Sequence, residues 1–257
     1  MYSGRGTLLA LLFAAVVSGA AGAQSGAAAT PDYLAILREI DRSQNFDDTD
    51  FSASFTFVSE KPDEEASVFK ARMFRRDSAD KFVLVFLEPP IQQGQGYLQV
   101  DENLWFYDPE SRKFTHSSLR ENLEDSEARN SDLRQSSLAT DYEVAAADHG
   151  TLGRYQVHVI ELTAAHDEVS FPSVKLWVRS DNNLVLKVEN YSLSGRLMRS
   201  DYFPNYVRVE DRLIASRALF VDELRPGERT QMTLTDTSLA TLPDSVFTKS
   251  YLERVNR

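Results

Sequence analysis

The sequence contains no cysteine, so the chain forms no disulfide and carries no thiol nucleophile. For the same reason we expect no lipid anchor of the bacterial lipoprotein type, which requires a cysteine at the mature N-terminus. Histidine is also rare: the chain has four, His116, His149, His158 and His166. None of them has a second ligand at the spacing of a zinc-binding helix, so they predict no zinc site.

Motifs of common catalytic sites are missing as well. There is no GxSxG nucleophile elbow, and the glycines at 94 and 96 lack the third glycine of a dinucleotide loop. We therefore predict no catalytic residue, no metal ligand and no cofactor. A secreted hydrolase with a dispersed site, such as a paired-carboxylate glycosidase, stays open because such pairs meet only in space. Acidic clusters without the central glycine of a calcium loop are interpreted as solvated surface: Asp47, Asp48, Asp50; Asp63, Glu64, Glu65; Glu121, Glu124, Asp125, Glu127.

Long apolar runs are absent beyond the first residues. Arg5 precedes an apolar stretch at 8–17 that is too short for a membrane span, and Ala21-Gly22-Ala23 follows as a cleavage pattern. This order predicts a signal peptide over 1–23, a flexible leader over 24–30 and one domain over 31–257. We expect the mature chain to be soluble outside the cytoplasm.

Acidic residues outnumber basic residues by 39 to 28, which gives a formal net charge of −11. A surface of this sign argues against nucleic acid and against anionic membrane surfaces as partners. The simpler interpretation, that the charge keeps the protein soluble, explains much of the excess.

The residues that are present predict a mainly β fold. Thr30 as N-cap and Pro31 at the first position predict a helix over 31–43. From Phe51 onward the apolar period becomes two, and turn signals separate successive strands. The architecture that we expect is one large, curved antiparallel sheet of roughly ten strands, forming an incomplete half-barrel. A polar excursion at 117–140 interrupts it, and we expect short helices there that act as a lid.

Two strands are apolar on both faces, at 81–87 and at 103–107 (NLWFY). Both faces must therefore be covered, by protein or by a bound lipid. An acyl chain gains on the order of 10 kcal/mol when it leaves water for an apolar cavity, at about 0.8 kcal/mol per methylene. The alternative is ordinary core packing. The inward, lipid-binding face is predicted to include Phe55, Phe57, Phe82, Leu84, Phe86, Leu104 and Phe106.

The run LWFYDP (104–109) resembles a strand of the periplasmic lipoprotein-sorting carriers of the LolA/LolB type. Three further stretches, RQSSLATDYEV (134–144), VKLWVRSDNNLVLKVENYSLSGRL (174–197) and LPDSVFTKSYLER (242–254), are similar to the broader group of LolA-like outer-membrane lipoprotein-sorting proteins. The resemblance covers nearly all of the mature chain through the order and spacing of these stretches.

The resemblance implies a half-open barrel with a helical lid, whose interior shelters the acyl chains of a lipoprotein or another lipid in the periplasm. It implies an inner-membrane transporter complex as partner, and a lid contact made by an arginine at the end of an early strand. Arg76 fits that position best, with Arg72 and Arg75 as alternatives. A second hypothesis is a non-catalytic accessory subunit of an ABC or RND-type exporter, with a solid core and no cavity.

Overall fold

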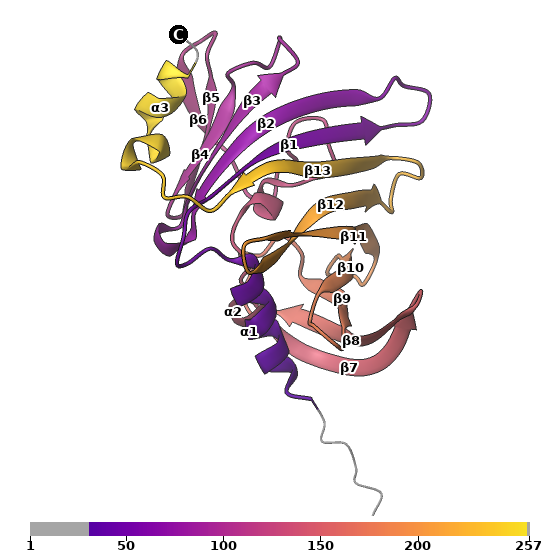
Figure 1. Cartoon of the computed structure of the whole chain (residues 1–257). Helices are drawn as coiled ribbons and strands as arrows, with labels where there is room; N and C mark the ends of the chain where they lie inside the picture. Colours follow the sequence, from indigo (N-terminus) through magenta and orange to yellow (C-terminus); the bar gives the residue numbers. More distant parts are fainter. Residues whose placement is uncertain (1–30, 256–257) are drawn as a thin grey trace, which may run out of the picture. The chain divides into compact units, whose positions relative to one another are not determined.

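Thirteen antiparallel strands, joined in a single sheet, form the framework of the protein (Figure 1). The computed structural model describes residues 31–255. The predicted signal peptide and the whole of the predicted leader lie outside these residues. The strands are β1 (Phe51–Glu60), β2 (Ser67–Arg76), β3 (Lys81–Glu88), β4 (Gly96–Val100), β5 (Asn103–Asp108), β6 (Lys113–His116), β7 (Tyr142–Leu152), β8 (Tyr155–Ala164), β9 (Ser173–Arg179), β10 (Val185–Tyr191), β11 (Leu197–Val209), β12 (Arg212–Asp222) and β13 (Arg229–Ser238).

The sheet consists of two meanders that meet in its middle. Its order is β6-β5-β4-β3-β2-β1-β13-β12-β11-β10-β9-β8-β7, so the first and last strands pair with each other. Strands β6 and β7 are the two free edges, and the sheet does not close into a barrel. The predicted open, curved antiparallel sheet is confirmed. Strand β7 was not predicted, because most of its side chains are exposed on both faces and it lacks apolar alternation.

Three helices accompany the sheet within the described part of the chain: α1 (Tyr33–Gln44), α2 (Leu138–Asp141) and α3 (Lys249–Arg254). The N-cap of α1 is Asp32, whose carboxylate accepts a hydrogen bond from the Ala35 N–H at 3.0 Å. The prediction of Thr30 as N-cap is wrong, because the acid two residues later offers the same capping oxygen. None of the helices in residues 31–255 is long and apolar enough to cross a membrane.

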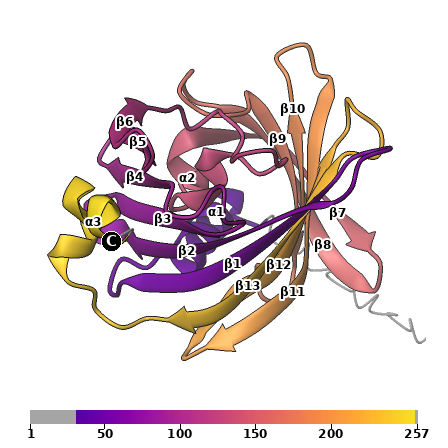
Figure 2. The same ribbon diagram turned by 90° about the horizontal axis from the view of Figure 1, so that it is seen from above.

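Helices α1 and α2 lie inside the curve of the sheet, and α3 lies on its outer side (Figures 1 and 2). Leu37 and Ile40 of α1 are fully buried among residues of β8, β9 and β10, so the predicted apolar stripe packs on the sheet. On the outer face, Val83 and Val85 of β3 pack with Leu252 of α3. Protein layers therefore cover both faces of the doubly apolar strand β3.

Gly96, the first residue of β4, lies close to the neighbouring strand β3 and to helix α3 on the outer face of the sheet. A methyl group added there would lie 2.4 Å from the Leu84 carbonyl oxygen and 2.9 Å from the Leu252 side chain. The first distance is far below van der Waals contact, and the obstructing atom belongs to the backbone. Only glycine fits without displacing β3.

We predict that Gly96→Ala lowers the free energy of unfolding by about 1–3 kcal/mol, the usual cost of overpacking. Gly150→Ala is the matched control, because the added methyl group would lie 3.4 Å from Val159, in ordinary contact. The control should stay within about 0.5 kcal/mol of the natural protein. Urea unfolding followed by circular dichroism measures both, and equal stabilities of the two variants would contradict the packing described here.

Candidate functional site

The seven residues predicted to bind lipid lie together on the inner face of the sheet. They come from β1, β3 and β5, and they share one core cluster. Phe106 packs against this cluster partly buried, whereas the other six are buried within it: Phe55, Phe57, Phe82, Leu84, Phe86 and Leu104. The aromatic rings are in direct contact; the rings of Phe57 and Phe69, for example, stack at 4.4 Å between centroids. Their role in lipid binding stays a prediction.

The connection from β6 to β7, residues 117–141, covers this face, and we call it the crossing segment. Leu123, Ala128 and Leu133 of the crossing segment are buried in the same cluster as the predicted lipid-binding residues. Its regular structure is limited to one 3₁₀ turn (Asn130–Leu133) and the four residues of α2 (Leu138–Asp141). The predicted lid is therefore mostly irregular chain, and its aliphatic side chains pack against the inner face of the sheet.

A cavity of about 160 Å³ remains beside the crossing segment. Of the seven predicted residues, Phe55 lines it. Sequence reasoning missed its other walls, which come from the end of α1 and from β11–β13. Phe203, Ile214 and Met232 belong to these walls and are only partly buried. Because pockets for whole small molecules measure about 300–1,000 Å³, a long acyl chain does not fit while the crossing segment is in place.

Arg199 of β11 fastens the crossing segment to the sheet. Its guanidinium donates two hydrogen bonds to the Asp132 carboxylate, at 2.8 and 2.9 Å, and one to the Glu127 carbonyl at 2.9 Å. It also donates to Asp201 at 2.9 Å, and that carboxylate accepts a further bond from Asn190 at 2.8 Å. The Arg199 side chain is buried, so removing one of its partners would leave an uncompensated charge in the interior.

Helix α1 holds the end of the crossing segment. The Asp41 carboxylate accepts hydrogen bonds from the N–H groups of Leu138 and Ala139, both at 2.8 Å, at the start of α2. The Asn45 amide donates to the Ser136 carbonyl at 2.7 Å and accepts from the Ser136 N–H at 2.6 Å. These bonds attach the C-terminal end of the crossing segment to α1.

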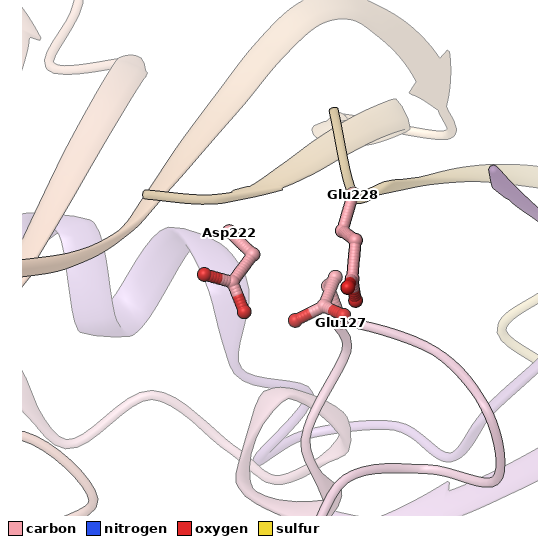
Figure 3. A group of neighbouring side chains, drawn as sticks. All are labelled: Glu127, Asp222 and Glu228. Carbon is pink, nitrogen blue, oxygen red and sulfur yellow. The ribbon is translucent and has the colours of Figure 1, made fainter. Parts of the chain in front are cut away.

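A third attachment involves three carboxylates, from Glu127, Asp222 and Glu228 (Figure 3). One oxygen of each lies within 4.8 Å of the others, which is close enough to hold a metal ion. Arg225 already pairs with Asp222 and Glu228 at 2.8 Å and with Glu127 at 3.3 Å. One guanidinium thus offsets part of the negative charge of the three carboxylates, and the cluster ties the crossing segment to the β12–β13 hairpin. The prediction that Glu127 is solvated surface is wrong, because the residue is buried.

Arg76 lies at the end of β2, as predicted, but its hydrogen bonds lead elsewhere. It donates to Asp50 at 2.8 and 2.9 Å, to the Leu242 carbonyl at 2.5 Å, and to Asp244. These partners precede β1 or follow β13, so Arg76 fastens the C-terminal segment rather than the crossing segment. The contact that the family resemblance assigned to Arg76 is made here by Arg199, which sequence spacing alone does not reveal.

The buried charges around Arg199 have shifted pKa values. The pKa of the Asp201 carboxyl is raised to about 6. Burial is the largest cause and the neighbouring Asp132 adds to it, whereas Arg199 acts in the opposite direction. Burial also raises the pKa of Glu127, against the opposing effect of Arg225. Two carboxylates facing one arginine leave an excess of negative charge, so a proton on Asp201 relieves their repulsion.

Comparisons with known proteins agree with this architecture. A family model described as "uncharacterized protein" matches residues 78–254, and the chain belongs to that family. No sequence among the curated proteins matches it. The crystal structure of a LolA superfamily protein from Nitrosomonas europaea is 25% identical, with a TM-score of 0.75, and the match covers 84% of this chain and 97% of that one.

Two further crystal structures share the fold. A putative outer membrane lipoprotein-sorting protein domain from Vibrio parahaemolyticus has a TM-score of 0.76 at 22% identity, over 86% of this chain and 98% of that one. A DUF1329 family protein from Desulfovibrio piger has a TM-score of 0.75 at 18% identity, over 87% and 100%. The fold is therefore LolA-like, and the resemblance seen in the sequence is confirmed.

We predict that Asp132→Asn loosens the crossing segment. The change removes the charge from the two Arg199 bonds and should cost about 1–3 kcal/mol of unfolding free energy. Amide hydrogen exchange in peptides from 117–141 should become faster than in the natural protein. Asp125→Asn is the comparison variant, because it removes the charge from another ion pair of the same segment, to Lys61, at a side chain that is 66% exposed, where such pairs contribute little. Unchanged exchange in Asp132→Asn would show that Arg199 does not hold the segment.

The raised pKa of Asp201 predicts a pH dependence of stability. An acid whose pKa is higher in the folded state binds more protons there, so its contribution to stability falls as the pH rises from about 4 to about 6 and levels off above that. Asp201→Asn keeps the shape and the acceptor oxygen without the charge. The variant should therefore lose less unfolding free energy than the natural protein between about pH 5 and about pH 7.5.

Asp181→Asn is the control for this measurement. The Arg179 hydrogen bond lowers the pKa of the exposed Asp181, so that carboxyl stays ionised over the whole range in both states. Identical pH profiles for Asp201→Asn and the natural protein, measured by urea unfolding, would contradict a protonated Asp201.

Proposed function

We propose that the protein is a soluble periplasmic carrier that shelters the acyl chains of a lipoprotein or another lipid during transport to the outer membrane. The observation that carries this proposal is the position of Leu123, Ala128 and Leu133, which cover the aromatic inner face from a segment held largely by polar bonds at its borders. We infer that these side chains occupy the place that an acyl chain takes when the segment moves away.

The energies of the exchange are compatible with this role. Each buried leucine gains about 1.5–3 kcal/mol from leaving water, so two leucines and an alanine contribute on the order of 5 kcal/mol. An acyl chain of ordinary length gains on the order of 10 kcal/mol on the same surface. The difference is of the same order as the cost of breaking hydrogen bonds to charged groups such as Asp132.

The cavity of about 160 Å³ bears on how a lipid would be loaded. Because the closed form has no room for a long chain, lid movement has to accompany loading. We propose that an inner-membrane transporter complex releases the crossing segment and delivers the lipid. The chemistry requires no catalytic group, no cofactor and no nucleic acid; the protein has to exclude water and release its cargo to a competing partner.

A second candidate is supported by the same small cavity. A protein with a filled interior suits the role of an accessory subunit on an envelope exporter, where only the outer surfaces are used. Under that reading the crossing segment never leaves the inner face. The two functions differ in whether the interior binds lipid at all.

We predict that the purified protein takes up a fluorescent fatty acid, and that Asp132→Asn takes it up faster because its segment is released more easily. Met232→Glu should abolish uptake, because it places a charge on the partly buried inner face of β13. Gln231→Glu adds the same charge to the neighbouring residue, which points to the other face of the strand, and should leave uptake unchanged.

Lipid extraction and mass analysis of protein purified from its native envelope complete the test. Bound acyl chains in the natural protein, and their loss in Met232→Glu, would support the carrier. A natural protein and an Asp132→Asn variant that both fail to take up the probe, together with the absence of extracted lipid, would reject the carrier in favour of the accessory subunit.

A further inference from the structure

A larger pocket, largely open to solvent, lies beside Arg129 of the crossing segment. Its volume is about 460 Å³, within the range of about 300–1,000 Å³ that is typical of small-molecule sites. Three parts of the chain form its walls: Arg129 of the crossing segment, the β8–β9 loop at 170–172, and the β10–β11 hairpin at 191–198. Most of the lining is apolar, with Phe171 and Met198 prominent.

Arg129 brings the polar chemistry to this pocket. Its guanidinium carbon lies 4.0 Å from the centre of the Phe171 ring, a stacked position that fixes the side chain against the wall. Within residues 31–255, the guanidinium donates one hydrogen bond, from Nη1 to the Ser170 carbonyl at 3.1 Å, and forms no ion pair. The other donors of its planar fork are thus available to a ligand.

The acids near Arg129 are already engaged with other arginines. Asp132 and Asp201 both accept hydrogen bonds from Arg199, and Glu127 pairs with Arg225. Burial lowers the pKa of Arg129, and the positive charge of Arg199 lowers it further. Both effects disfavour an unpaired cation at this position, and a bound anion would relieve them.

The shape of the pocket indicates what kind of anion fits. A guanidinium fork matches the two oxygens of a phosphate or carboxylate. The remaining walls expose mostly apolar area, from residues such as Phe171 and Met198, and also carry the hydroxyl groups of Ser192 and Ser194, which hydrogen-bond to each other. At the rim, Leu193 is 93% exposed and extends the apolar surface toward solvent. One charged group beside an apolar surface matches a ligand with a charged headgroup and an apolar chain.

We propose that this pocket binds the oxyanion headgroup of an anionic amphiphile, with the Arg129 fork on the phosphate or carboxylate and the start of the chain on Phe171 and Met198. The proposal rests on the carrier function and names its class of cargo. The proposal is also compatible with the net negative charge of the protein, because the half-buried guanidinium of Arg129 contacts the oxyanion and the rest of the surface does not.

The test compares three probes by calorimetry: dihexanoyl phosphatidylglycerol below its micelle concentration, dihexanoylglycerol, which has the same chains and no oxyanion, and inorganic phosphate. The natural protein should bind phosphatidylglycerol about tenfold more tightly than dihexanoylglycerol, which corresponds to one charge-assisted contact. Arg129→Gln should remove this preference and leave dihexanoylglycerol binding unchanged. Arg208→Gln, the same loss of charge at an exposed residue of β11 outside this pocket, should keep the preference.

Leu193→Asp provides a variant whose folding is not at risk, because the side chain it replaces lies almost entirely in solvent. It places a negative charge and a polar group at the rim, and should weaken phosphatidylglycerol binding more than dihexanoylglycerol binding. If Arg129→Gln does not fold, this variant alone decides, and equal effects on the two lipids would overturn the proposal.

The other outcomes separate the two proposals. Equal binding of both lipids, with fatty-acid uptake intact, would reject the headgroup site and leave the carrier standing. Inorganic phosphate bound as tightly as phosphatidylglycerol, and lost in Arg129→Gln, would make this a site for a small anion and overturn the amphiphile. Absence of binding by either lipid together with absence of fatty-acid uptake would reject both.

Discussion

The two free edges of the sheet belong to strands that follow each other in the chain. Strand β6 ends one side of the sheet and β7 ends the other, so residues 117–141 have to travel from edge to edge. In a sheet that curls, the short route crosses the concave side, and that is where Leu123 and Leu133 are buried. The cover over the aromatic face is thus a consequence of strand order. With this strand order, the connection between the two edge strands lies over the concave face of the sheet. The composition of that connection determines whether another molecule can displace it.

The composition of this segment divides its attachments into two kinds. The contacts with the inner face are aliphatic, and another hydrocarbon can replace them because the inner face stays covered and the burial of the entering chain offsets the exposure of the two leucines. The contacts at the borders are ion pairs and hydrogen bonds, to Arg199, Asp41 and Arg225. A lipid cannot replace these, and each charge left unpaired in the interior is costly. Under the proposed carrier function, the apolar contacts permit exchange, and the polar contacts keep the closed form until a partner protein, or water admitted by it, replaces the border contacts.

The inner face could be predicted from the sequence because alternation along a strand is local: Phe55 and Phe57 are two residues apart and necessarily share a face. The Arg199–Asp132 pair could not, because 67 residues separate its members and only the curl of the sheet brings them together. For the same reason Arg76 was assigned a contact that it does not make: its position on β2 was right, but whether it faces the crossing segment or the C-terminal segment depends on packing. The small cavity was also beyond prediction, since apolar strands indicate how much surface is buried but not whether protein or a guest buries it.

The Arg129 pocket and the aromatic face share the crossing segment as a common wall, and this relates their occupancies. The Arg129 N–H donates to the Asp132 carboxylate at 2.7 Å, and the same carboxylate holds Arg199. An oxyanion on the Arg129 fork therefore binds beside the bond that keeps the segment closed. If the headgroup is bound more tightly in the open form, it favours opening, and opening must strengthen headgroup binding by the same factor. In the carrier proposed above, headgroup binding and chain entry would thus strengthen each other, and this coupling would give selectivity for anionic lipids to a cavity whose walls distinguish little between one hydrocarbon and another.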